Sequence, residues 1–330
     1  MTAEPLTLLA ELRRDLKRDF RDAEMSRAEA RYVVDVYYQL QDFRIQAAGQ
    51  LRAEQGEPRR WAETLLRAFE LLEKDVQTVL GAWARREPAG EWAQSITGVG
   101  PVISAGLAAH IEIRRAVPFL EETGERPADA GVELVTATVG SIWRFAGLDP
   151  TLTWGKGEKR PWSAKLKVLC WKLGDSFVKQ SGRDSDVYGH VYRARKALEV
   201  ARNEAGEFAD QAAASLAERQ IKDKALRKTY EAGRLPDGRI DLRARRYAVK
   251  LFLAHYHHVA YESIMGIPPP MPYIFTENAR AMGLDGHNGF IGPPNWPLGA
   301  ASQESTVAHE RHVRIMERKA SRPRGEHRSR

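Results

Sequence analysis

The sequence contains a single cysteine and no long apolar run, and these two shortages exclude several classes of protein. The lone Cys170 excludes an intramolecular disulfide, and its helical spacing with neighbouring leucines predicts a buried small side chain. No stretch of about eighteen consecutive apolar residues is present, so the sequence predicts no membrane-spanning helix. The N-terminal segment is charged from Glu4 onward and lacks the apolar core of a signal peptide. We therefore expect a cytoplasmic protein.

Positive charge is also scarce over most of the chain. The formal net charge is +7, but residues 311–330 contain eight Arg or Lys against two Glu and so carry +6. The other 310 residues carry only +1. Overall charge therefore does not indicate nucleic-acid binding by the body of the protein, and an acidic partner has to be bound by local basic patches. The tail itself is typical of a disordered arm that makes nonspecific contacts.

Segments with the alternating pattern of β-strands are few, which favours a mainly α fold. Apolar residues recur at steps of three and four over residues 6–48 and again over 65–83, the pattern of a coiled-coil-like helical hairpin with a turn at 49–58. Its expected seam consists of Val33, Val36, Leu40, Phe43, Ala47, Leu65, Phe69, Leu72, Val76, Val79 and Trp83. Such helices either fold back on each other or pair with a second chain, and we expect a homo-oligomer through them.

The pattern of helices and breakers divides the chain into three regions. They are a helical coiled-coil-like region at 1–90, a helical domain containing a helix-hairpin-helix at 91–275, with a helical insertion at about 185–232, and a Gly/Pro-rich segment with the basic tail at 276–330. Within the second region we expect helices at 136–146, 163–180, 186–230 with a break near 203–206, and 242–264, and loops at 122–131 and 147–162.

The segment SITGVGPVISAGLAAHI, residues 95–111, places two glycines between two helical stretches. Gly-hydrophobe-Gly permits a tight turn with positive φ and leaves no Cβ near the backbone amides. These amides and the N-terminus of the next helix form a cradle for an anion such as a DNA phosphate, a contact that does not read base sequence. The expected contact residues are Gly98, Val99, Gly100, Pro101, Val102 and Ser104. The alternative is an ordinary helix junction packed in a core.

Two basic clusters are further candidates for DNA binding. In residues 156–172, six Lys or Arg face one Glu and alternate with tryptophans, a combination that neutralises phosphates and stacks on bases. The alternative is a solvated loop with core tryptophans. The cations expected to bind are Lys156, Lys159, Arg160, Lys165 and Lys167, and those of the second cluster are Arg243, Arg245 and Arg246. Double-stranded DNA is the expected partner, with RNA as the alternative.

A metal site is conceivable on one helix but incomplete. His255, His258 and Glu262 share a helical face, and a metal would need a further ligand from elsewhere that the sequence does not indicate. We expect no metal and no cofactor.

These motifs, in this order, resemble the C-terminal domain of bridge-RNA-guided DEDD insertion-sequence transposases. The resemblance rests on ITGVGPVISAGLAAHI, SIWRFAGLDP, PWSAKLKVLCWKL and RARRYAVKLFLAHYHHVAYE, and it covers about residues 94–265. In that family the domain follows a coiled coil, which matches the placement of the helical N-terminal region here. The resemblance implies a role in DNA transposition or recombination.

The sequence departs from that family at two points. The family begins with a nuclease-like domain that carries four acidic metal ligands, whereas this chain starts in helices. The family also has a catalytic serine in a Ser-Gly pair after the GLxP turn, where this sequence has Trp154-Gly155. An indole cannot form the covalent DNA ester that a hydroxyl forms. Thr153 lies one residue away, and Ser163 suits the N-cap of the following helix better than catalysis.

The resemblance and the departures together favour a DNA-binding protein without catalytic activity, in which no catalytic residue is assigned. One alternative is an active transposase or recombinase that uses a displaced nucleophile or a partner's nuclease domain. The other is an RNA-binding assembly protein.

Overall fold

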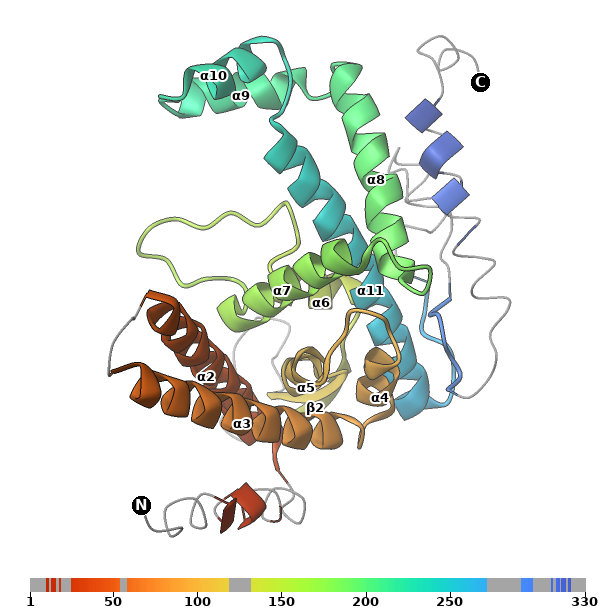
Figure 1. Cartoon of the computed structure of the whole chain (residues 1–330). Coiled ribbons are helices and arrows are strands. Elements are labelled where there is room, and N and C mark those ends of the chain that lie inside the picture. The colour runs from red at the N-terminus through yellow and green to blue at the C-terminus, as the bar shows by residue number, and fades with distance from the viewer. Residues whose placement is uncertain are drawn as a thin grey trace. The chain divides into compact units, whose positions relative to one another are not determined.

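The structure, a computed structural model of the 330-residue chain, describes residues 25–53, 58–118, 132–271 and 292–298, with a few further positions within 10–18 and 310–321. The fold is mainly α, as the sequence predicts (Figure 1). The helices are α2 Arg27–Ala53, α3 Pro58–Ala84, α4 Pro88–Gln94, α5 Pro101–His110, α6 Val139–Phe145, α7 Ala164–Gln180, α8 Val187–Glu204, α9 Ala209–Glu218, α10 Lys224–Glu231 and α11 Asp237–Met265. None of these described helices is long and apolar enough to cross a membrane.

Several expectations fall on other parts of the chain. The loop at 122–131, nearly all of the helical stretch before residue 25, most of the segment at 276–330 and most of the basic tail lie outside the described residues.

The strands are a short hairpin that the sequence analysis did not predict. β1 (Arg114–Pro118) and β2 (Val132–Thr136) pair antiparallel, with Arg115 opposite Val135. Each strand has only five residues, and β1 opens with two arginines, so the apolar alternation by which a strand is recognised is absent from β1 and too short to be distinctive in β2.

The chain divides into two compact units, residues 1–95 with 99–137 and residues 96–98 with 138–330. Helix α5 packs against both α2 and α3, and α4 and α5 lie in the same unit as these N-terminal helices. The division at residue 90 stays a prediction.

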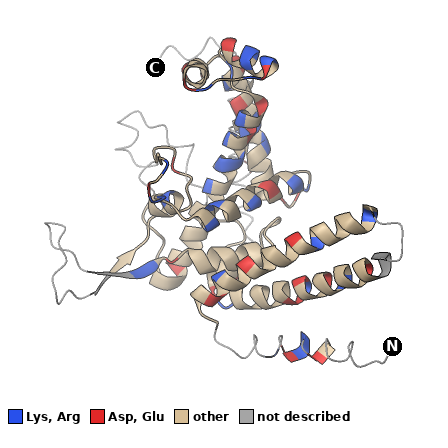
Figure 2. Ribbon diagram, turned by 90° about the vertical axis from the view of Figure 1, so that its left-hand side faces the viewer, with Lys and Arg blue, Asp and Glu red and all other residues tan. Residues whose placement is uncertain are grey.

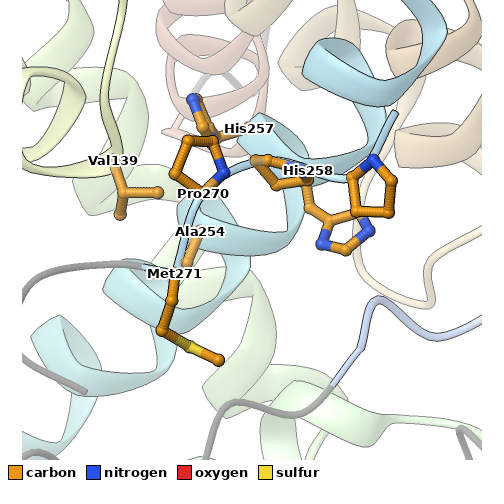
Figure 3. Close-up of a pocket in the computed structure, with 8 residues that line it drawn as sticks. Val139, Ala254, His257, His258, Pro270 and Met271 are labelled. Atoms are coloured by element: carbon orange, nitrogen blue, oxygen red, sulfur yellow. The ribbon is translucent and has the colours of Figure 1, made fainter. Parts of the chain in front are cut away.

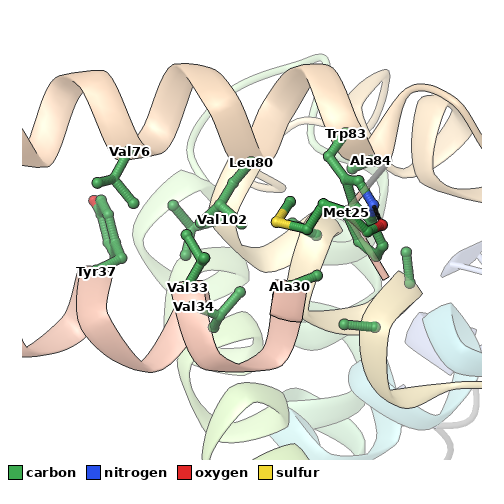
Figure 4. Close-up of a cluster of buried hydrophobic side chains, with 13 residues drawn as sticks. Met25, Ala30, Val33, Val34, Tyr37, Val76, Leu80, Trp83, Ala84 and Val102 are labelled. Atoms are coloured by element: carbon green, nitrogen blue, oxygen red, sulfur yellow. Dashed lines mark hydrogen bonds between the residues drawn. The ribbon is translucent and has the colours of Figure 1, made fainter. Parts of the chain in front are cut away.

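The core of the first unit lies between α2, α3 and α5. Figure 4 shows side chains of α2 and α3 facing each other, with Tyr37 beside Val76 and with Val102 of α5 between the two helices. Gly81 lets α3 approach the start of α5 closely, since a Cβ there would lie 2.9 Å from the Cβ of Pro101, and α2 packs along α3 on the same core. The hairpin predicted from the three-four spacing is therefore present within one chain.

The seam of this hairpin is only partly buried. Val33, Val76 and Trp83 are buried as predicted, but Phe43 and Leu65, near the connection between α2 and α3, are 53% and 55% exposed. Helix α2 also runs to Ala53, past the turn expected from Gly49 onward. A glycine at a helix position costs only about 1 kcal/mol, which packing can outweigh.

The second unit is built around three fully buried aromatic side chains. The ring of Phe177 on α7 stacks on Tyr188 of α8 with centroids 5.0 Å apart, and both rings contact Phe252 of α11. Gly174 lets α7 and α11 cross closely, since a Cβ there would lie 3.2 Å from Val249. Cys170 is buried beside this core, as the sequence predicts, and burial raises the pKa of its thiol to about 12.

The segment expected as a helical insertion, 185–232, contains α8, α9 and α10. Its break lies after Glu204, close to the predicted position. Phe208, Tyr230 and Leu235 form a small core of their own that holds α9 and α10 against the start of α11.

A buried carboxylate joins this lobe to the rest of the second unit. Glu199 on α8 is fully buried and accepts hydrogen bonds from Arg195, Arg202 and Arg243. Burial alone would raise the pKa of the Glu199 carboxyl, but Arg195 and Arg243 outweigh it, so the pKa lies below its ordinary value. The folded state therefore stabilises the ionised carboxylate.

We predict that Glu199→Ala lowers the free energy of unfolding by about 3 kcal/mol, because it leaves three arginines without their shared counter-charge. Equilibrium urea unfolding measures the loss. Since the pKa is lowered from 4.5, this stabilisation is complete above that pH and is lost as the pH falls through the folded-state pKa. The exposed Glu204→Ala on the same helix is the control; equal losses for the two variants would contradict a stabilising role for the network.

Candidate nucleic-acid interface

The predicted Gly-Val-Gly turn connects α4 to α5. Gly98 has φ +90°, a conformation that L side chains rarely adopt, and its carbonyl oxygen accepts a hydrogen bond from the Ser176 hydroxyl at 2.6 Å. A Cβ at Gly98 would also lie 3.3 Å from Ser176 Oγ and 3.4 Å from the Phe177 ring. The first glycine of the motif is therefore explained by backbone conformation and packing.

The second glycine has no such explanation within the chain. Gly100 is the N-cap of α5 with φ −80° and ψ 169°, and a Cβ there would meet nothing within 4 Å. No side chain caps the helix, and Pro101 occupies its first turn as predicted. The amides that follow therefore donate to no capping side chain of the described residues. Val102 and Ser104 are buried, however, and the Ser104 hydroxyl donates to the Gly90 carbonyl at 2.7 Å, so these two side chains serve packing.

The second unit brings together cations from three segments that are distant in sequence. Lys167 on α7 lies near Arg160 of the preceding loop and Arg246 of α11, and Arg246 lies near Lys250 one turn further along α11. Within the described part of the chain, Lys167, Arg246 and Lys250 have no carboxylate oxygen within 4.0 Å. Asp149 is the acidic group that acts on Lys250, and its charge raises the pKa of that lysine.

The lowered pKa values of these side chains show that their positive charges are held in an unfavourable environment. Burial, with Arg246 and Arg160 adding repulsion, lowers the pKa of Lys167. The pKa of Lys250 is lowered by burial and by Arg246, against the opposite effect of Asp149. Arg246 is itself affected by burial and by Arg243 and Arg239, which lower its pKa. Like charges held together at a surface favour the binding of an anion, which would relieve the repulsion.

Each of these cations except Arg246 lies over a tryptophan ring. The Arg160 guanidinium is 4.8 Å from the Trp154 ring centroid, Lys167 Nζ is 4.2 Å from that of Trp162, and Lys250 Nζ is 4.2 Å from that of Trp143. Trp143 is fixed by its indole N–H, which donates to the Lys250 carbonyl at 2.9 Å. We call this set the cation–aromatic surface: Arg160, Lys167, Arg246, Lys250, Trp143, Trp154 and Trp162.

Gly147 makes the close packing of this surface possible. Its φ is +66°, and a Cβ there would lie 2.9 Å from Lys167 Cδ and 3.0 Å from the Trp162 ring. The Ser163 amide beside Trp162 donates to the Phe145 carbonyl at 2.9 Å, which holds the loop against the end of α6. Ser163 caps α7, as predicted, by accepting from the Leu166 amide.

Two of the arginines expected to bind DNA are paired within the chain. Arg243 donates to Glu199 at 2.8 Å, and Arg245 donates to Asp241 at 2.6 Å and to Asp175 at 3.2 Å. Their counter-charges lie on α7, α8 and α11, in positions that the cluster RARRY does not reveal. Figure 2 shows why charge alone does not identify the interface: Lys and Arg are interspersed with Asp and Glu along the helices. Of the three predicted residues, Arg246 alone joins the cation–aromatic surface.

The remaining predicted cations are exposed. Lys156 and Lys159 lie in the loop before α7, and Lys165 lies in its first turn. The loop is closed on itself: the Trp154 indole N–H donates to the Glu158 carbonyl at 2.7 Å, and the Gly155 amide donates to the Glu158 carboxylate at 2.8 Å. Glu158 therefore supports the loop.

Sequence reasoning missed Trp143 as a member of the surface and gave Lys250 no role of its own. Lys250 follows Arg246 at i+4, a spacing that places both on one helical face and could have revealed it. Trp143 carried no signal, because its partner is more than a hundred residues away.

The histidines of α11 do not converge on a common point. His255 is fully buried and shares a hydrogen bond of 2.7 Å with the Tyr188 hydroxyl, whereas His258 pairs with Glu262 at 3.3 Å. Burial lowers the pKa of His258 despite Glu262. No group of three potential metal ligands occurs among the described residues. His257 and His258 instead line a largely apolar cavity of about 190 Å³, together with Val139, Pro270 and Met271 (Figure 3).

Comparison with family models, with curated proteins and with solved structures finds no significant match for this chain. The arrangement of side chains is therefore the basis on which its function is inferred.

We predict that the two glycines of the turn respond differently to substitution. Gly98→Ala should destabilise the fold by about 1–3 kcal/mol, the usual cost of a strained backbone conformation. Gly100→Asp should fold at least as stably as the parent chain, because aspartate is a favoured N-cap. Its carboxylate would occupy the α5 amides and repel phosphate, so DNA affinity should fall.

Thermal unfolding and fluorescence anisotropy with a labelled duplex measure the two effects. Gly100→Asn is the matched control, since it caps the helix without adding charge. An unchanged DNA affinity in Gly100→Asp would mean that the turn is only a structural junction.

Proposed function

We propose that this chain is a DNA-binding protein that grips the phosphate backbone through the cation–aromatic surface of its second unit. The observation that carries the proposal is the convergence of Lys167, Arg246 and Lys250 without ion-pair partners among the described residues. Arg243 and Arg245 of the same unit are, by contrast, paired with carboxylates of the chain.

A polyanion is the ligand that fits this surface best. Each phosphate brought against a cation releases condensed counterions, so the bound state gains free energy from both attraction and counterion release. Such contacts position the protein without reading base sequence. The amides at the start of α5 offer a further anion site of the same kind, which Gly100 leaves accessible.

We further propose a relationship to insertion-sequence transposases with loss of catalytic activity. At the position where the resembling family has its serine, Trp154 is committed to the loop through its indole N–H. The nearest hydroxyls serve other purposes or none: Ser163 caps α7, and Thr153 is exposed in the loop. The residues at this position therefore support DNA binding and not catalysis.

The partner expected from the sequence is double-stranded DNA, and the expected setting is the cytoplasm; both stay predictions. The expected homo-oligomer through the N-terminal helices also stays a prediction. It would rest on Phe43, Trp61 and Leu65, which are exposed near the connection between α2 and α3.

We predict that the double variant Lys167→Gln/Arg246→Gln binds duplex DNA more weakly and with a flatter salt dependence. Each lost phosphate contact should reduce the slope of log K against log salt concentration by about 0.9. Anisotropy titrations of a labelled 20-bp duplex with the full chain, at several salt concentrations, measure the slope.

The control for this experiment removes equal charge elsewhere. Lys224 and Lys228 are exposed on α10 and have no ion-pair partner among the described residues, so Lys224→Gln/Lys228→Gln changes the net charge by the same amount. If both double variants reduce the slope equally, binding depends on net charge and the proposed surface has no special role.

We predict that the full chain neither nicks nor joins DNA. Incubation with supercoiled plasmid and with branched DNA, in the presence of magnesium or manganese, should give no nicked product and no covalent protein–DNA adduct. Cleavage that Thr153→Ala or Ser163→Ala abolishes would instead identify a displaced nucleophile and an active recombinase.

A further inference from the structure

Three large aromatic side chains are exposed on the second unit close to its unpaired cations. Phe145 at the end of α6 is 45% exposed, Trp154 in the following loop 41%, and Trp171 on α7 57%. Exposed apolar side chains scattered singly need no explanation, but a group of them beside a charged surface marks a site of interaction.

The three aromatics belong to the neighbourhood of the cation–aromatic surface. Trp154 has the Arg160 guanidinium over its ring. Trp171 follows Lys167 by four residues, so the two lie on the same face of α7. Phe145 is two residues before Gly147, against which Lys167 and the Trp162 ring pack, and its carbonyl accepts from Ser163.

The position of Trp154 is fixed rather than free. Its indole N–H donates to the Glu158 carbonyl at 2.7 Å, and the Glu158 side chain returns to the Gly155 amide at 2.8 Å. A ring held in this way loses little conformational entropy when a ligand binds on it. Trp171 projects from a regular helix and is also part of a rigid element.

An intact duplex offers no base face on which these rings can stack. In a B-form duplex the bases stack on one another, and a protein reaches only their edges and the phosphates. An exposed indole can stack on a base only when that base is unpaired, and such stacking tolerates any sequence because every base has a π-face. A surface built only for duplex phosphates would need the cations but not the exposed rings.

We infer that the cation–aromatic surface, extended by Phe145 and Trp171, binds single-stranded nucleic acid in preference to duplex. Lys167, Arg246 and Lys250 hold the phosphates, while Trp154, Trp171 and Phe145 stack on unpaired bases. This inference rests on the proposed function and specifies the state of its ligand. Single-stranded DNA and single-stranded RNA share the chemistry that is recognised.

The test compares three labelled probes by anisotropy with the full chain: a 20-nucleotide DNA strand of mixed sequence, its duplex, and the RNA strand of the same sequence. We expect the DNA strand to bind more tightly than the duplex. Trp154→Ala and Trp171→Ala should each weaken single-strand binding roughly tenfold and leave duplex binding nearly unchanged. Trp154→Phe and Trp171→Phe keep a π-face and should restore most of the affinity.

The matched control is Tyr32→Ala, which removes a 70% exposed aromatic side chain from α2 in the first unit. It should affect neither probe. Equal loss of single-strand and duplex binding in the Trp154 and Trp171 variants, or no loss in either, would overturn the inference while leaving phosphate binding by Lys167 and Arg246 intact. Absence of binding to all three probes at low salt would overturn the proposed function itself. The ratio of RNA to DNA affinity identifies which strand is preferred.

Discussion

The packing of Phe177, Tyr188 and Phe252 holds α7, α8 and α11 together, and the candidate interface depends on it. These rings come from α7, α8 and α11, and all three are fully buried. Burying a large aromatic side chain contributes roughly 2–3 kcal/mol, and aromatic pairs add further stabilisation. Because Gly174 allows α7 to cross α11 at Val249, the start of α7 and the middle of α11 are brought into one region. The cations of the candidate interface are carried by these two stretches.

The same packing brings positively charged side chains close together. At one place carboxylates of the chain neutralise them, and at another they are not neutralised. Toward α8, Arg243 and Arg245 reach Glu199, Asp241 and Asp175, so their charge is neutralised internally. Toward the loop before α7, Arg246 lies near both Lys167 and Lys250, and none of the three has a carboxylate oxygen within 4.0 Å among the described residues. Arg245 and Arg246 are adjacent on α11 but have different neighbours, because a helix turns about 100° per residue.

Features that depend on neighbouring residues could be predicted from the sequence, whereas features that depend on distant residues could not. The turn at Gly98 and the N-cap at Ser163 depend on neighbouring residues, and the sequence located both. The ion pairs of Arg243 and Arg245 depend on partners 44 and 70 residues away, and sequence spacing gives no sign of them. The β1–β2 pair was missed for the same reason, since two short strands are recognised only by their partner.

The coiled-coil pattern illustrates a different limit. Its spacing correctly indicated that α2 and α3 form a hairpin, yet it could not say where along the hairpin the seam is covered. Val33 and Val76 are buried beneath α5, while Phe43 stacks on Phe69 with centroids 6.0 Å apart and is left half exposed. Periodicity fixes the face of a helix, but the third element that covers this face comes from a distant part of the sequence.

The two glycines of the 95–111 segment differ in whether the fold requires them. Gly98 is needed by the chain itself, through its positive φ and its contacts with Ser176 and Phe177. Gly100 has an ordinary backbone conformation and open space where a Cβ would be. Gly100 is thus a position at which neither backbone conformation nor packing requires a glycine. Trp154 is used by the chain in two ways, through the hydrogen bond of its indole N–H to the Glu158 carbonyl and through the Arg160 guanidinium over its ring, while 41% of the side chain stays exposed.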